Sequence, residues 1–214
     1  MKPIFITGIG TGVGKTIVSA IVTEALQADY WKPVQAGFEE GTDALSVQHL
    51  LTNTTSVIHP EVYMLTLPAS PHIAAREEGV QISIEAIFDA YKKLPCNNNY
   101  MVIEGAGGLL VPLNEDEFVI DLVEKLGAEV ILVSRNYLGS INHSLLTAAM
   151  CQQRNLNILG WIFNDQYLNY EKEIAKWSGY PVLGSVPLLQ SIGKEQVLEH
   201  AARLRETLKI HLYN

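Results

Sequence analysis

The chain has 214 residues, which is the size of one large domain, because domains typically run to about 100–200 residues. Hydrophobic residues make up 48% of the sequence and charged residues 18%, which excludes chain-wide disorder driven by charge and low hydrophobicity. The formal net charge of −8 argues against a general binder of nucleic acid or anionic membranes, which would present a basic surface, so any anion-binding site must be built locally.

Short apolar segments alternate with amphipathic ones, a pattern typical of βα units around a mostly parallel sheet. A first strand is expected at 3–7, and the segment 15–28 is the clearest helix because its apolar residues recur at helical spacing. Further helices are predicted at 144–154 and around 197–208. The other strands are predicted at 30–34, 100–104, 129–134, 158–164 and 181–186.

Breaks in this pattern are too short to separate domains. The segments 37–42, 67–71 and 95–99 contain turn-forming residues and are long enough for loops, though not for a domain linker. We therefore predict a single α/β domain over residues 1–214, with helices on both faces of a mostly parallel sheet.

Cysteine content and hydropathy bear on the compartment. Cys96 and Cys151 are too few for a secreted disulfide scaffold, and neither has metal-binding spacing. No stretch approaches the roughly 20 apolar residues of a membrane-spanning helix, and the N-terminus runs into a glycine-rich segment where a signal peptide would continue its apolar region. These features favour a cytoplasmic protein without a membrane partner.

The segment GIGTGVGKT (residues 8–16) follows the first strand and opens the first helix. Its glycines let successive backbone N–H groups face one concavity, where they and the positive end of the helix can bind phosphate oxygens. Lys15 is expected to reach the terminal phosphates, and the Thr16 hydroxyl to coordinate Mg²⁺. Five residues separate Gly8 from Gly14, whereas the common phosphate loop has four at this place. The context predicts a nucleotide site in a phosphate-loop NTPase-like fold.

Two acidic residues are candidate magnesium ligands, since Mg²⁺ on bound phosphates takes only one or two protein carboxylates. Glu104 ends an apolar strand and precedes GAGG (residues 105–108), interpreted as a flexible loop at the carboxyl edge of the sheet, where ligands bind. The alternative for Glu104 is a solvated strand-end acid. Asp43 follows a Gly-Thr pair and begins an apolar stretch, so its own context favours an ordinary helix cap or first-turn acid.

Lys32 ends the second predicted strand and would direct a second cation to the same edge. A surface lysine is an equal alternative at this position. If Lys15 and Lys32 face one site, they can neutralise charge on a transferring phosphoryl group and its acceptor.

Taken in order along nearly the whole chain, these motifs resemble the dethiobiotin synthetase family. Beyond the phosphate loop, the matching segments are KPV (32–34), DAL (43–45), SPH (70–72), EGAGG (104–108), GSINH (139–143) and GWIFN (160–164). The resemblance implies an ATP- and Mg²⁺-dependent ligase that joins 7,8-diaminononanoate and CO₂ or bicarbonate. The implied products are dethiobiotin, ADP and phosphate, formed through a carbamate and a carbamic-phosphoric anhydride.

The same resemblance implies roles for individual residues. The implied catalytic residues, which contact the transferred phosphoryl group or the carbamate, are Thr11, Lys15 and Lys32. The implied Mg²⁺ ligands are Thr16, Asp43 and Glu104. The implied nucleotide-binding residues are Gly10, Gly12, Val13, Gly14, Lys15, Thr16, Asn164 and Pro187, of which Asn164 reads the base. The implied substrate-binding residues are Lys32, Ala36, Gly107, Ser140, Ile141 and Asn142.

The resemblance further implies a homodimer with the diamine across the subunit boundary. The amides of residues 140–142 would then bind the remote carboxylate of the substrate held by the partner subunit, and the alternative is a plain helix start capped by Asn142. Ala36 stands where relatives usually carry Ser or Thr, so backbone donors or Gln35 must replace that hydroxyl. The alternatives for His72 are an approach to the diamine and a structural role, of which the structural role is favoured. The region after Pro187 that helps enclose the base in relatives is short.

The alternative function is a partner-binding regulatory ATPase of the partitioning or septum-placing kind. Such proteins carry an extra lysine near the start of the phosphate loop, and residues 8–13 contain none. The sequence also has no basic amphipathic tail for membrane attachment. Both observations favour the synthetase.

Overall fold

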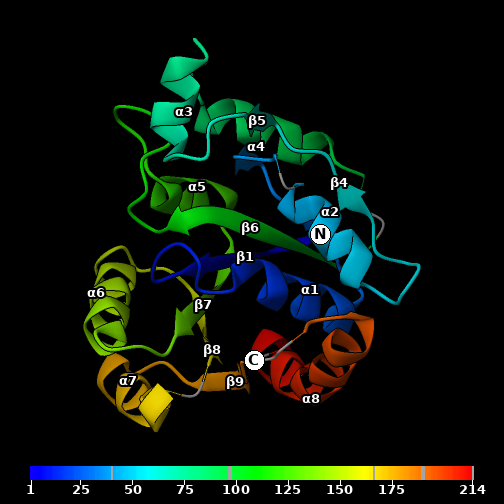
Figure 1. The fold of residues 1–214 in the computed structure, drawn as a ribbon, viewed down its shortest axis with the longest axis vertical. Helices are drawn as coiled ribbons and strands as arrows, with labels where there is room; N and C mark the ends of the chain where they lie inside the picture. The colour runs from blue at the N-terminus through cyan, green and yellow to red at the C-terminus, as the bar shows by residue number, and fades with distance from the viewer. Residues whose placement is uncertain (40, 96–97, 166, 189–190, 214) are drawn as a thin grey trace.

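The large β-sheet of this protein is entirely parallel (Figure 1). A computed structural model describes residues 1–39, 41–95, 98–165, 167–188 and 191–213. Within these residues the sheet has seven strands in the order β4-β2-β6-β1-β7-β8-β9. Their bounds are β1 (Lys2–Gly8), β2 (Asp29–Trp31), β4 (Ile58–His59), β6 (Tyr100–Gly108), β7 (Glu129–Arg135), β8 (Ile158–Asn164) and β9 (Val182–Val186). The predicted parallel α/β architecture is confirmed.

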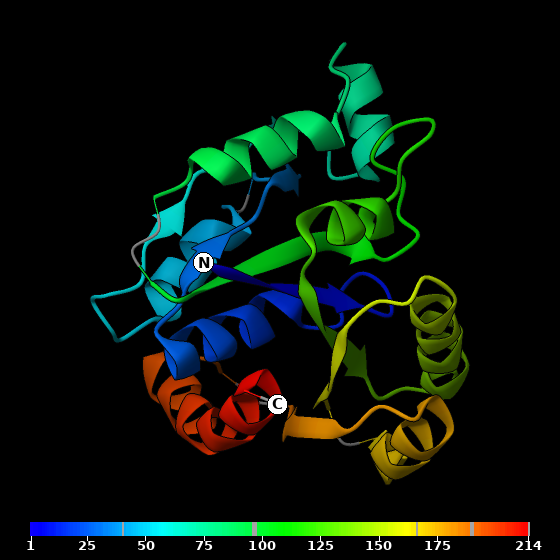
Figure 2. The same ribbon diagram turned by 180° about the vertical axis from the view of Figure 1, so that it is seen from behind.

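Helices cover both faces of this sheet (Figures 1 and 2). One face carries α1 (Lys15–Leu26), α2 (Asp43–Leu50) and α8 (Lys194–Tyr213). The other face carries α4 (Ile84–Lys93), α5 (Val119–Leu126), α6 (Ser140–Gln153) and α7 (Glu171–Ser178), the last preceded by a 3₁₀ turn, η1 (Tyr167–Asn169). A small parallel sheet of β3 (Val34–Ala36) and β5 (Tyr63–Leu65) packs against α3 (Pro71–Glu77). None of the described helices is both long and apolar enough to cross a membrane.

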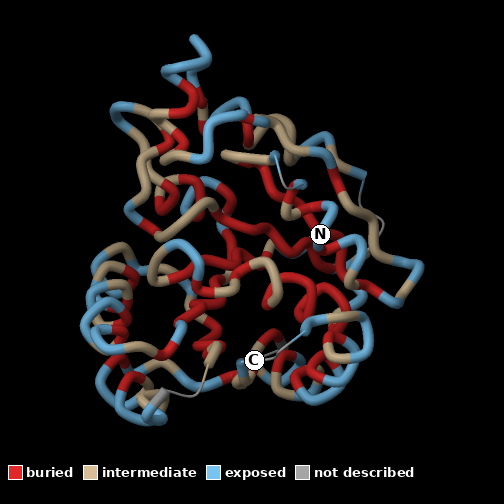
Figure 3. The backbone as a smooth tube through the Cα atoms, viewed as in Figure 1, coloured by how far each residue is buried: buried red, intermediate tan, exposed pale blue. Residues whose placement is uncertain are grey.

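The side chains of the central strands form two cores, one on each face. Ile4 and Ile6 of β1 pack toward α1 and α8, whereas Phe5 between them packs on the opposite side. This alternation follows from the two-residue period of a β-strand, and it explains why these strands are apolar throughout. Figure 3 shows the buried residues concentrated along the strands and on the inner sides of the helices. Both cores are filled mainly by aliphatic side chains.

The prediction of one continuous strand at 30–34 is wrong, because the segment is divided between two strands. β2 ends at Trp31, and the chain resumes as β3 at Val34 in the small sheet. Pro33 lies at the break, and because proline has no N–H it cannot continue the ladder of a central strand. Its carbonyl instead accepts hydrogen bonds from the backbone N–H groups of Val62 and Tyr63, at 2.9 and 3.0 Å. Lys32 is therefore placed where the chain leaves the large sheet, at the carboxyl end of β2.

Two other predicted elements need correction. Residues 105–108 are not a flexible loop, because β6 continues through them and Gly108 pairs with Gly8 after a register shift. The helix predicted from 144 begins at Ser140, directly after Gly139 in a left-handed conformation, so Asn142 lies within α6 and does not cap it. Residues 96 and 97 of the predicted loop 95–99, and with them Cys96, lie outside the described residues, and Cys151 is buried with a free thiol.

Strand order places the predicted site residues at one edge. β6 lies between β2 and β1, so the carboxyl ends of these three parallel strands are neighbours. The phosphate loop follows β1 and Lys32 follows β2. Glu104 is the middle residue of β6, one position beyond Ile103, which pairs with Trp31 at the end of β2. Ligands of open α/β sheets bind in the crevice at such an edge.

Glu24, on α1, holds the segment that follows α2. Its buried carboxylate accepts hydrogen bonds from the backbone N–H and hydroxyl of Thr52, at 2.8 and 2.7 Å. It also accepts from the backbone N–H and side-chain amide of Asn53, at 3.2 and 3.0 Å. Burial opposes ionisation of this carboxyl, but the hydrogen bonds together lower its pKa. This contact helps to fix α1 and α2 relative to each other. It thereby bears on the positions of Thr16, near the start of α1, and Asp43, the first residue of α2.

We expect Glu24→Ala to lower the free energy of unfolding at neutral pH by about 2–3 kcal/mol, because several donors, two of them backbone amides, lose a charged acceptor. The lowered pKa means that the ionised carboxyl stabilises the fold above the ordinary carboxyl pKa of about 4.3, and that this stabilisation is lost as pH falls through the lowered folded value. Urea unfolding of both proteins at pH 7 and at stepwise lower pH should show the difference shrinking in acid.

Glu77→Ala is the matched control, since Glu77 is an exposed acid on α3, and its effect should stay within about 0.5 kcal/mol. Equal losses in the two variants at pH 7 would contradict the anchoring role of Glu24.

Candidate active site

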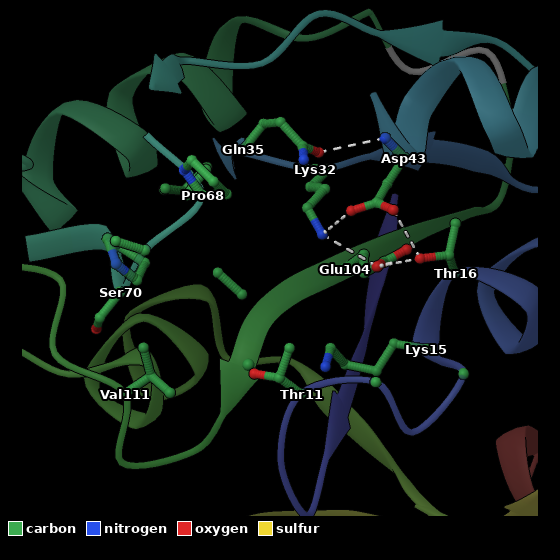
Figure 4. Close-up of a pocket in the computed structure, with 18 of the residues that line it drawn as sticks. Thr11, Lys15, Thr16, Lys32, Gln35, Asp43, Pro68, Ser70, Glu104 and Val111 are labelled. Atoms are coloured by element: carbon green, nitrogen blue, oxygen red, sulfur yellow. Dashed lines mark hydrogen bonds and ion pairs between the residues drawn. The ribbon is translucent and has the colours of Figure 1, made fainter. Parts of the chain in front are cut away.

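A cavity of about 790 Å³ opens at the carboxyl edge of β1, β2 and β6 (Figure 4). This volume is within the range of small-molecule sites, roughly 300–1,000 Å³. Its walls come from the phosphate loop, the segment after β2, the start of α2, the end of β6 and the segment before α3. The residues that line it include Thr11, Gly12, Gly14, Lys15, Thr16, Lys32, Gln35, Ala36, Asp43, Ser70, Glu104, Gly107 and Val111.

The phosphate loop presents backbone donors and a lysine to this cavity. Gly12 and Gly14 have φ values of +71° and +89°, which L-residues rarely adopt. Gly14 precedes α1 without a side-chain cap, so the first amides of the helix are available to an anion. The Lys15 ammonium donates to the carbonyl of Gly10 at 2.9 Å. Burial lowers the pKa of Lys15 to about 8, against the opposing effect of Glu104.

Four side chains form a compact polar cluster deeper in the cavity. The Nζ atom of Lys32 lies 2.6 Å from Oδ2 of Asp43 and 3.1 Å from Oε1 of Glu104. The Oγ1 atom of Thr16 lies 2.9 Å from Oδ1 of Asp43 and 2.9 Å from the same Glu104 oxygen. Figure 4 shows Lys32, Asp43 and Glu104 directed toward one another above the loop that carries Lys15. The four residues come from four separate elements, so only the folded chain assembles them.

Burial excludes the simpler interpretations of two of these residues. Lys32 is 5% exposed and Glu104 is 1% exposed, so neither is a surface residue or a solvated strand-end acid. Asp43 is the first residue of α2, but the cap of that helix is Thr42, whose hydroxyl accepts from the Leu45 N–H at 3.2 Å. The Asp43 carboxylate is thus free of the capping role and points into the cluster.

The charges in the cluster support one another. Burial opposes the charge of Lys32, yet the nearby carboxylates of Glu104 and Asp43 raise its pKa above the ordinary lysine value. Burial likewise opposes ionisation of Asp43, but Lys32, the Thr16 hydroxyl and Lys15 together more than offset it, so the pKa of Asp43 is lowered. The site therefore contains a permanent cation between two carboxylates at neutral pH.

The oxygen donors of this cluster fit a magnesium ion. Thr16 supplies a hydroxyl that lies within hydrogen-bond distance of both the Asp43 and the Glu104 carboxylates. No group of three or more His, Cys, Asp or Glu side chains suited to a metal occurs among the residues that the structure describes, so no metal centre built from such side chains alone is indicated. Two carboxylates and a hydroxyl suit Mg²⁺, which usually completes its shell with water and substrate phosphates.

A smaller cavity of about 150 Å³ lies beside the phosphate loop. It shares Gly12, Gly14 and Ile17 with the large cavity, so the loop lies between the two. Asn164, at the end of β8, lines it and donates from its side-chain amide to the carbonyl of Val13. Pro187 closes one side. A nucleotide whose phosphates lie on the loop can place its base here.

Some predicted residues do not reach the large cavity. Ser140, Ile141 and Asn142 start α6 and do not line it. His72 does not line it either, and its Nδ1 lies 3.0 Å from the hydroxyl of Ser70. Any substrate contact by residues 140–142 would therefore require another chain or a rearrangement.

Ala36 lines the large cavity, and Gln35, one of the candidates to replace the hydroxyl expected at position 36, lines it too and makes two other contacts. The Gln35 amide donates to the carbonyl of Gly37 at 2.7 Å, and its oxygen accepts from the N–H of Asp43 at 3.2 Å. One end of this side chain therefore holds the start of α2 and the other holds the segment after β3. Backbone donors remain the other candidates for the role of the hydroxyl.

Sequence reasoning missed several residues at the site, and three of them have polar side chains that bear on its chemistry. Tyr30 bonds to Glu104, Ser70 lines the large cavity, and Arg135 lines the small one. Ser70 belongs to the SPH segment, to which no role was assigned. Arg135 is the charged residue directly after the predicted strand 129–134, which is a usable signal. Tyr30 gave none, because an aromatic residue inside a strand normally indicates core packing.

Comparison with known proteins identifies close relatives. A family model described as an AAA domain matches residues 2–196. An ATP-dependent dethiobiotin synthetase from Cytophaga hutchinsonii is 53% identical over 207 residues, which cover 95% of this chain and 97% of the relative. The enzyme of the same name from Christiangramia forsetii is 45% identical, covering 97% of this chain and 98% of the relative. These matches span nearly the full length of each relative.

Similar solved structures share the fold at low sequence identity. The septum site-determining protein MinD from Pyrococcus horikoshii, solved with Mg-ADP, has a TM-score of 0.61 at 15% identity and covers 98% of both chains. A ParA family ATPase from Chlorobium tepidum has a TM-score of 0.58 at 16% identity, covering 98% of this chain and 93% of its own. Both confirm the phosphate-loop NTPase fold, and at this identity they say nothing further of function.

We expect Gly14→Ala to weaken ADP binding at least tenfold more than Gly12→Ala. Both glycines have positive φ, so both substitutions carry a backbone cost of about 1–2 kcal/mol. A Cβ atom at Gly14 would in addition collide with the side-chain amide of Asn164, whereas one at Gly12 meets open space. Calorimetric titration with ADP compares the two variants directly. Equal affinities would show that contact between the loop and Asn164 does not matter for binding.

Proposed function

Because this chain belongs to the dethiobiotin synthetase family, we propose that it is an ATP-dependent ligase that converts 7,8-diaminononanoate and CO₂ into dethiobiotin. The observation that carries the proposal is the convergence of Lys15, Lys32 and the carboxylates of Asp43 and Glu104 in one cavity at the phosphate loop. The 53% identity to the dethiobiotin synthetase of Cytophaga hutchinsonii, over nearly the full length of both chains, supports the proposal.

The reaction needs positioning and charge stabilisation and does not require a covalent enzyme nucleophile. One amine of the substrate adds through nitrogen to the carbon of CO₂ and loses a proton, which gives a carbamate. A carbamate oxygen then attacks the terminal phosphorus of ATP while the bond to the leaving ADP oxygen breaks. The second amine attacks the carbonyl carbon of the resulting carbamic-phosphoric anhydride, phosphate leaves, and a further proton is released as the cyclic urea closes.

The two lysines address the main electrostatic obstacle, which is that a carbamate must approach a triphosphate of the same charge. Lys15 lies in the loop and would hold the terminal phosphates, while Lys32 on the opposite wall would hold the carbamate. Thr11 lines the same cavity and is proposed to contact the transferred phosphoryl group. Holding the reacting atoms roughly 3–3.5 Å apart removes much of the entropic barrier, and fixed cations stabilise the charge that develops.

We propose that Thr16, Asp43 and Glu104 hold Mg²⁺ together with the phosphates, as the donor chemistry of the cluster suggests. The bound ion would neutralise charge on the phosphates and on the leaving ADP. Asn164 and Pro187, beside the loop, are proposed to contact the base. Ala36 and Gly107 line the large cavity and would contact the substrate through backbone groups.

We propose that the working form is a homodimer. Within one chain, residues 140–142 do not line the large cavity. A groove of about 310 Å³ between the phosphate loop and α6 shares Thr11 and Val111 with that cavity, and Leu110 and Leu146 beside it are 54% and 62% exposed. An apolar surface continuous with the site suits a second copy, whose α6 start would then bind the substrate carboxylate.

A regulatory ATPase of the same fold is the alternative. The structural resemblance to MinD and ParA proteins establishes the fold and does not favour their function over that of the close relatives. The two possibilities differ in what controls ATP hydrolysis, because a ligase consumes ATP only when the acceptor is present.

We expect the purified protein to form dethiobiotin and ADP in equal amounts from ATP, bicarbonate and 7,8-diaminononanoate in the presence of Mg²⁺. Mass spectrometry of the product and a coupled ADP assay would follow both together. Omission of the diamine should reduce ADP formation to background, because the phosphoryl acceptor is then missing. ADP release that is indifferent to the diamine would favour the regulatory ATPase.

We expect Lys15→Ala and Lys32→Ala each to lower kcat by a factor of about 100 or more, the usual effect of removing a group that stabilises transition-state charge. Because Lys32 is buried between two carboxylates, its variant must be checked for folding by circular dichroism. Lys92→Ala removes an exposed lysine on α4 and should keep the wild-type rate. A near-normal rate in Lys32→Ala would exclude its proposed role.

Mixing two variants tests whether each active site is built from two chains. One variant is Lys32→Ala, and the other is Asn142→Asp, whose added charge should repel the substrate carboxylate. If each site combines two chains, a mixed dimer regains one intact site. Random mixing should then restore about a quarter of the wild-type rate, since half of the dimers are mixed and one of their two sites is intact. No restoration would show that the site lies within one chain or that the protein does not dimerise.

A further inference from the structure

Tyr30 makes a buried hydrogen bond to one of the residues proposed to hold Mg²⁺. Its hydroxyl donates to Oε2 of Glu104 at 2.9 Å, and both side chains are almost fully buried. We propose that Tyr30 is a positioning residue that orients the Glu104 carboxylate so that only its Oε1 atom serves the magnesium site. The inference rests on the proposed function, because it assigns the geometry of that same metal site.

The register of the sheet explains how a core tyrosine reaches this carboxylate. Tyr30 of β2 pairs with Val102 of β6, and neighbours paired in a parallel sheet point to the same face. Glu104 lies two residues beyond Val102 and therefore points to that face as well, diagonally across from Tyr30. A long aromatic side chain spans the diagonal, and its hydroxyl meets the carboxylate. The contact is thus set by strand pairing and does not depend on a flexible loop.

The two oxygens of Glu104 have different partners. Oε1 lies 3.1 Å from the ammonium of Lys32 and 2.9 Å from the hydroxyl of Thr16, both of which line the cavity. Oε2 accepts from Tyr30 on the side of the hydrophobic core. Without the tyrosine hydroxyl, Oε2 would be buried without a hydrogen-bond donor, which is energetically unfavourable. Rotation of the carboxylate would bring Oε2 toward other donors, but it would weaken the contacts of Oε1 with Lys32 and Thr16.

The removal of the hydroxyl by Tyr30→Phe tests the proposal. Groups that orient metal ligands typically change metal affinity by 10–100-fold when they are mutated. We expect Mn²⁺, used as a spectroscopic substitute for Mg²⁺, to bind the ADP complex of the variant about tenfold more weakly, as measured by electron paramagnetic resonance. Calorimetry should show that ADP alone binds within about twofold of the wild type, because the loop and the base site are untouched.

Two controls separate orientation from general damage. Tyr63→Phe removes a hydroxyl that accepts from the N–H of Ser83, away from the site, and should leave Mn²⁺ affinity unchanged. In a Glu104→Gln background, Tyr30→Phe should cause no further loss, because the tyrosine acts through the carboxylate. Equal Mn²⁺ affinity in wild type and Tyr30→Phe would overturn the inference while leaving the proposed function intact. Absence of any metal effect on the wild-type ADP complex would overturn the proposed metal site and the inference together.

If Tyr30→Phe does not fold, replacement of Tyr30 with 3-fluorotyrosine retains the hydroxyl and gives a second measurement. The ¹⁹F resonance at position 30 should shift when Mg²⁺ is added to the ADP complex, and this shift should vanish in Glu104→Gln. A resonance that does not respond to Mg²⁺ would likewise overturn the inference.

Discussion

The ion pairs of Lys32 with Asp43 and Glu104 are the interaction on which the site depends. Each buried charge costs several kcal/mol of desolvation, so an unpaired lysine at this depth would lose its proton or move to solvent. The two carboxylates raise the pKa of Lys32, and Lys32 lowers that of Asp43. The cluster therefore stays charged because its members offset one another. Because the charges must stay close together to offset one another, the separate segments that supply the three residues must be held in fixed positions.

That fixed placement comes from the order of the strands. β6 is inserted between β2 and β1, which brings Glu104, Lys32 and the phosphate loop to one edge, and Glu24 helps to hold α2 with its Asp43 over that edge. The structures of MinD and ParA proteins share the overall fold at 15–16% identity. The fold thus provides the phosphate loop and the crevice, and the side chains placed at the crevice decide the chemistry.

The sequence allowed the sheet, the phosphate loop and the candidate cations and acids to be predicted, because buried parallel strands and glycine-rich loops have strong local patterns. The break after Trp31 had a local signal in Pro33, which the prediction of one strand at 30–34 overlooked. The continuation of β6 through Gly108 could not be predicted, since it depends on which strands become neighbours. Tyr30 was missed for the same reason. Its hydroxyl matters only because the register places it diagonally opposite Glu104, and no local pattern encodes that partner.

The balance of charge in the cavity suggests how an acidic protein can bind anionic substrates. Lys15 and Lys32 are matched by Asp43 and Glu104, so the side chains alone give the site little net attraction for a triphosphate. A divalent cation held by the carboxylates would leave both lysines in excess, and only a strongly anionic ligand would then restore neutrality. Nucleotide and metal are therefore expected to bind better together than separately. On this argument the acidic residues of the cluster make nucleotide binding depend on the metal, and Tyr30, by fixing one carboxylate, contributes to that dependence.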